Sequence, residues 1–198
     1  MKRFNKYLYQ LSFLCLLMPA PAAWAVEGWI TLLDGTTGME NFDHLGEANW
    51  TAVDGAIQAT EGPGGAAFLV TKEDYGDFSL RIEFWASDDA NSGIFMRCQD
   101  RSNVNDRNCY EANIYDQRPD PTYGTGGIVH VGPLSDYRPM AGGQWNTFEI
   151  TLQGSRLMAV FNGQTTVDVQ DSQFASGAIA LQWGRGTIRF RKVEILPL

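Results

Sequence analysis

Two short runs in the middle of the chain carry the residues best suited to chemistry, NSGIFMR at 91–97 and YEANIYD at 110–116. Both runs alternate apolar and polar residues, and successive side chains of a β-strand point to opposite faces of its sheet. This alternation predicts that Arg97, Glu111 and Asn113 stand on one sheet surface. A cation, a carboxylate and an amide are groups that bind and transform a sugar, so this surface is the predicted site.

The same alternation predicts the neighbours of these polar groups. Phe95 is expected to share a face with Arg97, and Tyr115 to share a face with Glu111. A long irregular segment with two prolines follows at 117–125, and long loops often line sites. Aromatic rings and a loop are therefore expected around the predicted site.

The elements that must position these groups are short strands. Alternating runs separated by glycine, asparagine and aspartate fill the chain beyond residue 25, and no segment there has a long apolar i, i+3, i+4, i+7 pattern. Asp54-Gly55 and Asn162-Gly163 are hairpin signals, because these pairs accept the positive φ angles of tight turns. About a dozen strands favour an all-β chain in which two antiparallel sheets pack face to face, as a jelly-roll or lectin-like sandwich.

The first residues are typical of a secretory signal peptide. Three cations precede an apolar run, and Ala23-Trp24-Ala25 supplies a small-x-small cleavage pattern. We therefore expect residues 1–25 to be a signal peptide, residues 26–198 to form one domain, and the mature protein to be periplasmic or secreted. The apolar run is shorter than the ~20 residues that span a bilayer, so no membrane span is expected.

The charge balance argues against nucleic acid as a partner. The formal net charge is −8, and it becomes −11 without residues 1–25, which hold three cations and no acid. Such an acidic surface repels phosphate backbones, and no basic stripe is present. The oligomeric state is left open by these numbers.

Cys98 and Cys109 are the only cysteines beyond the predicted signal peptide. They flank a polar segment that joins two predicted strands, and an exported protein favours oxidation, so we predict a disulfide between them. Two free thiols are the alternative. Zinc would need more ligands than two cysteines and two histidines supply at any familiar spacing.

Several segments share their order with one known family. They are GWITLLDGTTGMENF, NSGIFMR, YEANIYD, TGGIVH, GQWNTFEI, and GAIALQWG followed by FRKVEILPL. Together they resemble the 3-keto-disaccharide hydrolase-like domain over nearly all of the mature chain. The resemblance implies a concanavalin-like sandwich and activity on 3-keto-glucosides, by 1,2-elimination to a 3-keto-2-hydroxyglucal and hydration of that product.

The reaction that the resemblance implies defines roles for the candidate residues. A ketone at C3 acidifies the C2 hydrogen, so a base can remove it while a donor stabilises the enolate. Glu111 is the predicted base or acid, Arg97 the donor, and His130 a proton shuttle, while Asn113 and Gln182 are predicted to bind sugar hydroxyls. Alternatively, Glu111 and Arg97 form a simple cross-strand ion pair on a solvated face, and His130 is a structural histidine hydrogen-bonded in the sheet. The family commonly has a tyrosine in place of this histidine.

Four further residues are candidates for the site. Glu83 is either a third site carboxylate or a surface charge. Trp183 either stacks on a sugar ring or belongs to the core. Arg191 could extend the cationic patch, and Asp116 reaches the face of Glu111 only through a β-bulge.

Two other classes of function fit the same residues. One is a non-catalytic, lectin-like carbohydrate-binding module. The other is a retaining endoglucanase, in which two carboxylates flank the scissile bond. Glu111-Ala-Asn-Ile-Tyr-Asp116 weakly resembles the strand that carries those carboxylates. The expected partner in each case is an oligosaccharide or a 3-keto-glycoside. A divalent metal is left open, with Glu111, Glu83 and His130 as available ligands.

Overall fold

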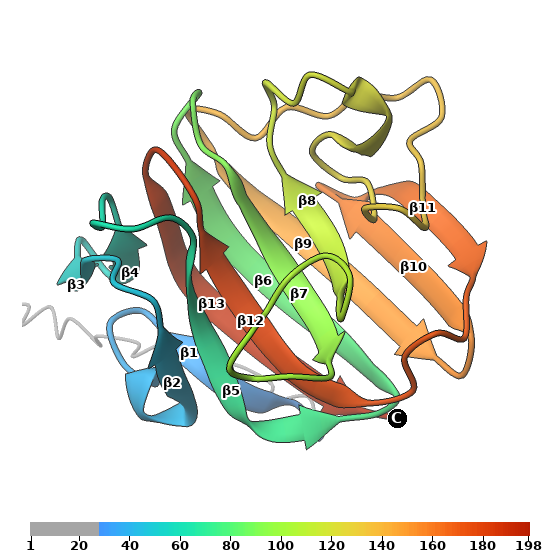
Figure 1. Ribbon diagram of the computed structural model, residues 1–198, viewed down its shortest axis with the longest axis horizontal. Helices are drawn as coiled ribbons and strands as arrows, with labels where there is room; N and C mark the ends of the chain where they lie inside the picture. The colour runs from blue at the N-terminus through green and yellow to red at the C-terminus, as the bar shows by residue number, and fades with distance from the viewer. Residues whose placement is uncertain (1–27) are drawn as a thin grey trace, which may run out of the picture.

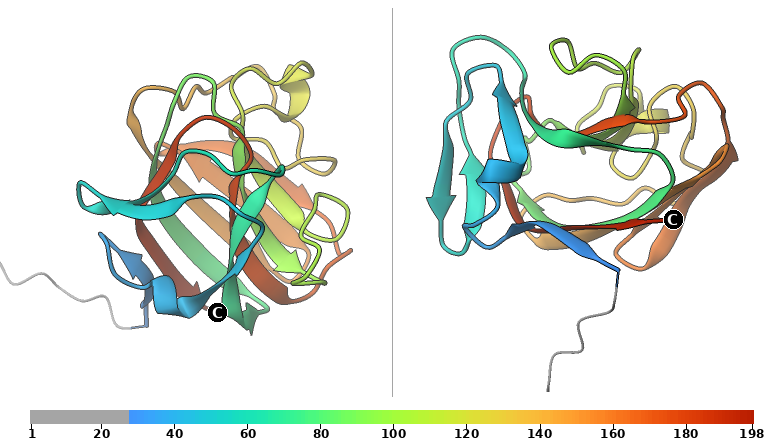
Figure 2. Two further views of the ribbon diagram at one scale, coloured as in Figure 1. Left: turned by 60° about the vertical axis from the view of Figure 1, so that its left-hand side comes forward. Right: turned by 90° about the horizontal axis from the view of Figure 1, so that it is seen from below.

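The computed structural model describes residues 28–198, so the predicted signal peptide at 1–25 lies outside the described residues. Two antiparallel sheets pack face to face in this part of the chain (Figure 1 and Figure 2). The predicted all-β sandwich is confirmed. The only helical segments of residues 28–198 are two 3₁₀ turns, η1 (Met39–Asn41) and η2 (Pro121–Tyr123). None of these described helices is long and apolar enough to cross a membrane.

The larger sheet has eight strands. Their order is β11 (Gln164–Gln170), β10 (Arg156–Phe161), β9 (Trp145–Gln153), β6 (Phe78–Ala86), β13 (Ile188–Pro197), β4 (Ala56–Ala59) and β3 (Trp50–Val53), and β1 (Ile30–Asp34) also pairs with β13. Strand β6 shows why the sequence forms such a sheet. Leu80, Ile82 and Phe84 are buried in the core between the sheets, whereas Arg81 and Glu83 alternate with them on the outer face.

The smaller sheet has five strands and carries the predicted site. Their order is β2 (Phe42–Leu45), β5 (Ala67–Tyr75), β12 (Gly177–Trp183), β7 (Ser92–Cys98) and β8 (Tyr110–Ile114). Every residue of β7 and β8 is buried. Their inner face belongs to the core, and a loop covers part of their outer face, so these strands are shielded on both sides.

That loop connects β7 to β8 and spans residues 99–108; we call it the disulfide loop. A disulfide joins Cys98 to Cys109 at its two ends, as predicted. Arg101 fastens the loop to β5 by donating to the Thr71 carbonyl and by pairing with Asp74 at 2.6 Å. The loop therefore crosses in front of β7 and β12, as Figure 1 shows.

The two predicted hairpin turns are also confirmed. Asp54 and Gly55 join β3 to β4 with φ angles of 49° and 75°. Asn162 and Gly163 join β10 to β11 with φ angles of 47° and 80°. Two successive positive φ angles match the twist of the flanking strands, which is why Asp-Gly and Asn-Gly predicted these turns.

Candidate functional site

A pocket of about 510 Å³ lies on the outer face of the smaller sheet, under the disulfide loop. Its polar lining comes from four parts of the chain. These are the residue before β7, strand β12, strand β8 with the segment after it, and the disulfide loop. These polar residues are Asn91, Glu111, Tyr115, Arg118 and Gln182, and from the disulfide loop Ser102, Asn103, Asn105 and Asp106. The apolar part of the wall comes from Leu45, Ala66, Phe68, Phe95 and Val104.

A larger and more open hollow of about 770 Å³ lies between the loops at 47–49 and 61–63. Both of its carboxylates, Glu47 and Glu61, are exposed to solvent. Functional sites gather ionisable groups whose pKa is perturbed by burial. The pocket under the disulfide loop is therefore the candidate site.

Glu111 is the central ionisable group of this pocket. Strand β8 places it beside Phe95 of β7, and only 7% of its surface is exposed. The pKa of Glu111 is raised from the ordinary 4.5 to about 7: burial is the largest cause, the negative charge of Asp106 adds to it, and Arg118 opposes the shift. A carboxyl group with this pKa exchanges protons readily at neutral pH.

Gln182 and Asn113 differ in their access to the pocket. Gln182 lines the pocket, and its buried Oε1 has no hydrogen-bond partner among residues 28–198. Such an acceptor is suited to a hydroxyl group of a ligand. Asn113 is fully buried beside the pocket, and its Nδ2 donates to the Tyr123 carbonyl at 2.5 Å, so it fastens the 121–127 turn.

Arg97 lies elsewhere, and the prediction that it shares a face with Phe95 is wrong. The pairing of β7 with β12 shifts between Phe95 and Cys98, and Arg97 adopts a left-handed φ of 51°. This bulge breaks the alternation on which the prediction depended. The buried guanidinium instead donates to the carbonyls of Gly76, Gly154 and Phe174 and pairs with Asp77 at 2.9 Å.

Glu83 and Arg191 also lie outside the pocket. They stand on β6 and β13 of the larger sheet, where Arg191 Nε is 2.6 Å from Glu83 Oε2. The Arg191 guanidinium covers the Trp145 ring at 4.2 Å. The structure corrects the prediction that these residues join the site, because the larger sheet presents them on its own outer face.

Trp183 and Asp116 stabilise the fold and lie outside the pocket. Trp183 packs in the core between the sheets, and its Nε1 donates to the Gly186 carbonyl at 2.9 Å. Asp116 accepts hydrogen bonds from the Ala141 and Gly142 amides and from the Thr125 hydroxyl. Neither side chain lines the pocket, so the two carboxylates of the endoglucanase pattern do not meet there.

His130 lies next to the pocket and contacts one of its walls. Its Nε2 is 2.9 Å from Asp106 Oδ2, and Asp106 lines the pocket that holds Glu111. Sequence analysis did not single out Asp106, whose type and spacing are ordinary for a polar loop. The disulfide prediction was the available signal, because it indicated that this loop returns to the start of β8.

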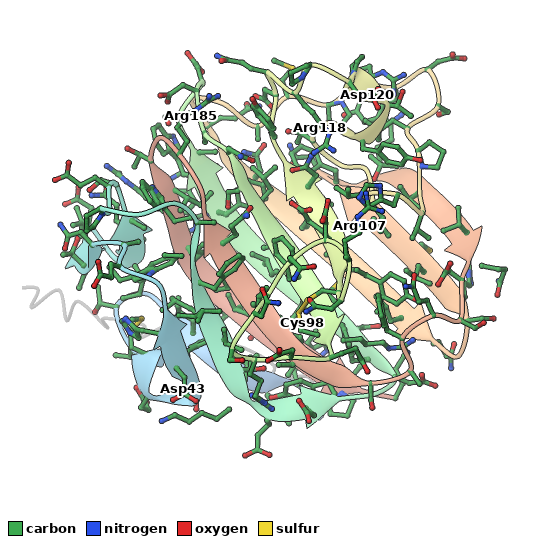
Figure 3. The ribbon with its side chains drawn as sticks, in the orientation of Figure 1. Asp43, Cys98, Arg107, Arg118, Asp120 and Arg185 are labelled. Atoms are coloured by element: carbon green, nitrogen blue, oxygen red, sulfur yellow. A yellow bond between two sulfur atoms is a disulfide. The ribbon has the colours of Figure 1, made fainter. Side chains whose placement is uncertain are left out.

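Arg118 is the cation that the pocket contains in place of Arg97. It follows β8 (Figure 3), lines the pocket and is partly buried. Among residues 28–198, no ion pair involves Arg118. The long loop at 117–125 was expected to line the site, but alternation cannot single out a residue in an irregular loop.

The candidate metal ligands are not brought together. Glu83 lies on the larger sheet, away from Glu111, and His130 contacts Asp106 instead. Residues 28–198 contain no group of three or more His, Cys, Asp or Glu side chains that could hold a metal ion.

The pocket has a buried carboxyl group, a cation and an unpaired amide oxygen on a lectin-like sheet. Residues 28–196 match the sequence model of the 3-keto-alpha-glucoside-1,2-lyase-like domain. The chain belongs to this family. A search of curated protein sequences with this lyase-like domain found no match.

Solved structures share the fold of the lyase-like domain. A candidate glycosyl hydrolase from Parabacteroides distasonis superposes with a TM-score of 0.74 at 15% identity, over 86% of this chain and 94% of its own. A second one from that organism has a TM-score of 0.68 at 22% identity, over 86% and 99%. A carbohydrate-binding module from Bacillus subtilis has a TM-score of 0.58 at 16% identity, over 84% and 94%. At these identities, the likeness concerns the fold alone.

Proposed function

We propose that this lyase-like domain cleaves 3-keto-glucosides by 1,2-elimination, and that hydration of the 3-keto-2-hydroxyglucal product completes a net hydrolysis. The observation that carries the proposal is Glu111. Its carboxyl group is buried in a polar pocket, and its pKa is raised to about 7 by burial and by Asp106. A group that is partly deprotonated at neutral pH can serve first as a base and then as an acid.

The proposed elimination uses the acidity of the C2 hydrogen beside the C3 ketone. Glu111 takes the C2 proton, and the electrons of the C2–H bond form an enolate on the C3 oxygen. The enolate then collapses: the C3 ketone re-forms, a double bond forms between C1 and C2, and the C1–O bond breaks. The leaving oxygen takes a proton, which protonated Glu111 can supply. Addition of water across the new double bond follows the same steps in reverse.

Arg118 is proposed to stabilise the enolate. It lines the same pocket as Glu111 and has no ion-pair partner among the described residues. A cation held in a partly buried pocket stabilises a developing negative charge more than it would in bulk water. The unpaired Oε1 of Gln182 is proposed to accept a hydrogen bond from a sugar hydroxyl.

Turnover of 3-keto-glucosides tests the proposal directly. The wild-type protein is incubated with 3-keto-glucosides, with and without a chelator, and formation of the conjugated enone is followed by its ultraviolet absorbance. Glu111→Gln should lower the rate by about 10²–10⁴-fold, which is typical for loss of a general base. Arg118→Ala should lower kcat by about 10²-fold or more, which is typical for loss of a group that stabilises an oxyanion.

The matched controls are Glu149→Gln and Arg156→Ala, which remove exposed charges on the larger sheet. Both should retain wild-type turnover. Unchanged turnover in Glu111→Gln would contradict the catalytic assignment. Binding of glycosides by a wild-type protein that turns none of them over would favour the carbohydrate-binding module instead.

A further inference from the structure

His130 makes a specific contact with the wall of the candidate site. Its Nε2 lies 2.9 Å from Asp106 Oδ2, near the C-terminal end of the disulfide loop. About a third of each side chain is exposed, with relative surface areas of 34% and 37%. Asp106 is the residue of this pair that lines the pocket with Glu111, so the side chain of His130 meets the pocket wall at Asp106.

The backbone at His130 is held in a conformation that histidine rarely adopts. Its φ of 66° lies in the left-handed region, inside a tight turn in which the Gly132 amide donates to the Ile128 carbonyl. A residue other than glycine is strained in this region, and such conformations cluster at functional sites. A glycine would remove this strain but would also remove the contact with Asp106.

The turn that carries His130 is fastened to the strand that carries Glu111. The Val129 amide donates to the Glu111 carbonyl at 2.9 Å, and the Asn113 amide donates to the Gly127 carbonyl at 2.9 Å. The backbone of Glu111 therefore holds the turn, and the side chain of His130 in turn holds Asp106. The disulfide and the contacts of Arg101 restrain the backbone of the loop, and His130 adds a contact to the Asp106 side chain itself.

We propose that His130 is a positioning residue that fixes the Asp106 carboxylate at the pocket wall, where it faces Glu111. This inference rests on the function proposed above. Asp106 then acts on Glu111 by charge: a nearby carboxylate opposes the ionisation of a second one. The role of His130 is to keep that charge in place.

The charged and titratable groups around this pair are few. The pocket that holds Glu111 is also lined by Asp106 from the disulfide loop and by Tyr115 and Arg118 from the segment after β8. Asp106 in addition has Arg107 Nε at 3.9 Å from its Oδ1. Asp106 raises the pKa of Glu111 and Arg118 lowers it, both acting on top of burial. A displaced or neutral Asp106 should therefore allow Glu111 to ionise at lower pH.

Direct titration of Glu111 in the full mature protein tests this inference without requiring turnover. The carboxyl carbon of Glu111 is followed by NMR in protein labelled with ¹³C-glutamate, and its signal is assigned by its absence in Glu111→Gln. Three variants are compared with wild type. Asp106→Asn removes the charge, His130→Gly removes the contact and relieves the backbone, and His130→Gln retains an N–H donor.

The expected order of midpoints follows from these changes. Asp106→Asn and His130→Gly should shift the midpoint of Glu111 to lower pH, and the inflection of the kcat/KM profile that reports Glu111 should move in the same direction. His130→Gln should stay near the wild-type midpoint. A merely structural histidine would change stability without this pattern of shifts and rescue.

Two results would overturn the positioning role: an unshifted midpoint in His130→Gly, or equal midpoints in His130→Gly and His130→Gln. An unshifted midpoint in Asp106→Asn would show that Asp106 does not act on Glu111, which also overturns the inference. Absence of turnover in wild type would contradict the proposed function, and the NMR titration would still decide the role of His130.

Discussion

Gly93 stands against the carboxyl group of Glu111 across the pair of strands β7 and β8. A Cβ atom added to Gly93 would lie 2.9 Å from Glu111 Oε1 and 3.1 Å from its Cγ. Because glycine has no side chain, the Glu111 carboxyl group can lie against the backbone at Gly93. The position of this carboxyl group therefore depends on residue 93 being glycine.

Gly93→Ala is expected to displace the Glu111 carboxyl group while keeping the fold. Turnover should fall by about 10- to 100-fold, because misplacement of a catalytic group by about 1 Å can cost 10²-fold. Stability should fall by about 1 kcal/mol, because the crowded atoms belong to a side chain that can move. Steady-state kinetics and urea denaturation measure the two effects. Gly64→Ala is the matched control, since a Cβ there meets nothing within 4 Å.

Glu111→Gln is expected to stabilise the protein at alkaline pH. The pKa of Glu111 is raised from 4.5 to about 7, so the folded protein holds a proton that the unfolded chain has released between these values. Stability of the wild type therefore falls as pH rises through this window and levels off above it. Glutamine does not titrate, so the variant escapes this loss.

The advantage of Glu111→Gln should be about 3 kcal/mol larger at about pH 8 than at about pH 4, by the relation between pKa shift and free energy. Urea denaturation at the two pH values checks it. An advantage that does not change with pH would mean that the pKa of Glu111 is not raised by folding.

Arg97→Ala is expected to act on stability and not on the chemistry. The buried guanidinium donates to three backbone carbonyls, and its removal leaves them without these donors, at a cost of about 3 kcal/mol or more. The kcat/KM of the folded protein should stay within about twofold of wild type, a change well below that of losing a catalytic group. Thermal unfolding and kinetics below the transition separate the two effects.

Arg156→Ala is the control for Arg97→Ala, because Arg156 pairs with Asp168 on an exposed face, and it should change stability little. A stable Arg97→Ala protein with strongly reduced turnover would restore the catalytic role that the sequence suggested for Arg97.

Loss of the disulfide is expected to weaken both the fold and the site. Replacing Cys98 and Cys109 with alanine opens a loop with a sequence separation of 11. The chain-entropy relation gives a loss of about 2–3 kcal/mol for such a loop. KM should rise as well, because the released segment lines the pocket. Denaturation and kinetics with and without reductant check this, and reduced wild type should resemble the double variant.

Local patterns in the sequence were sufficient for the class of fold and for part of the site. The alternation along β6 and β8 predicted strands correctly, because side-chain direction in a strand has a period of two set by the backbone itself. Asp54-Gly55 and Asn162-Gly163 predicted hairpin turns for an equally local reason, their tolerance of positive φ. Glu111 and Tyr115 were placed on one face by the same rule, and both line the pocket.

Tertiary structure decided which of the candidate groups meet. The bulge at Arg97 depends on how β7 pairs with β12, a strand about eighty residues further along the chain. Glu83 and Glu111 stand on similar alternating runs, and only the assignment of β6 and β8 to different sheets separates them. Asp106 and Arg118 enter the pocket from loops, whose course is set by contacts between residues distant in sequence. Periodicity determines the direction of a side chain within its strand, whereas its neighbours depend on how strands and loops pack.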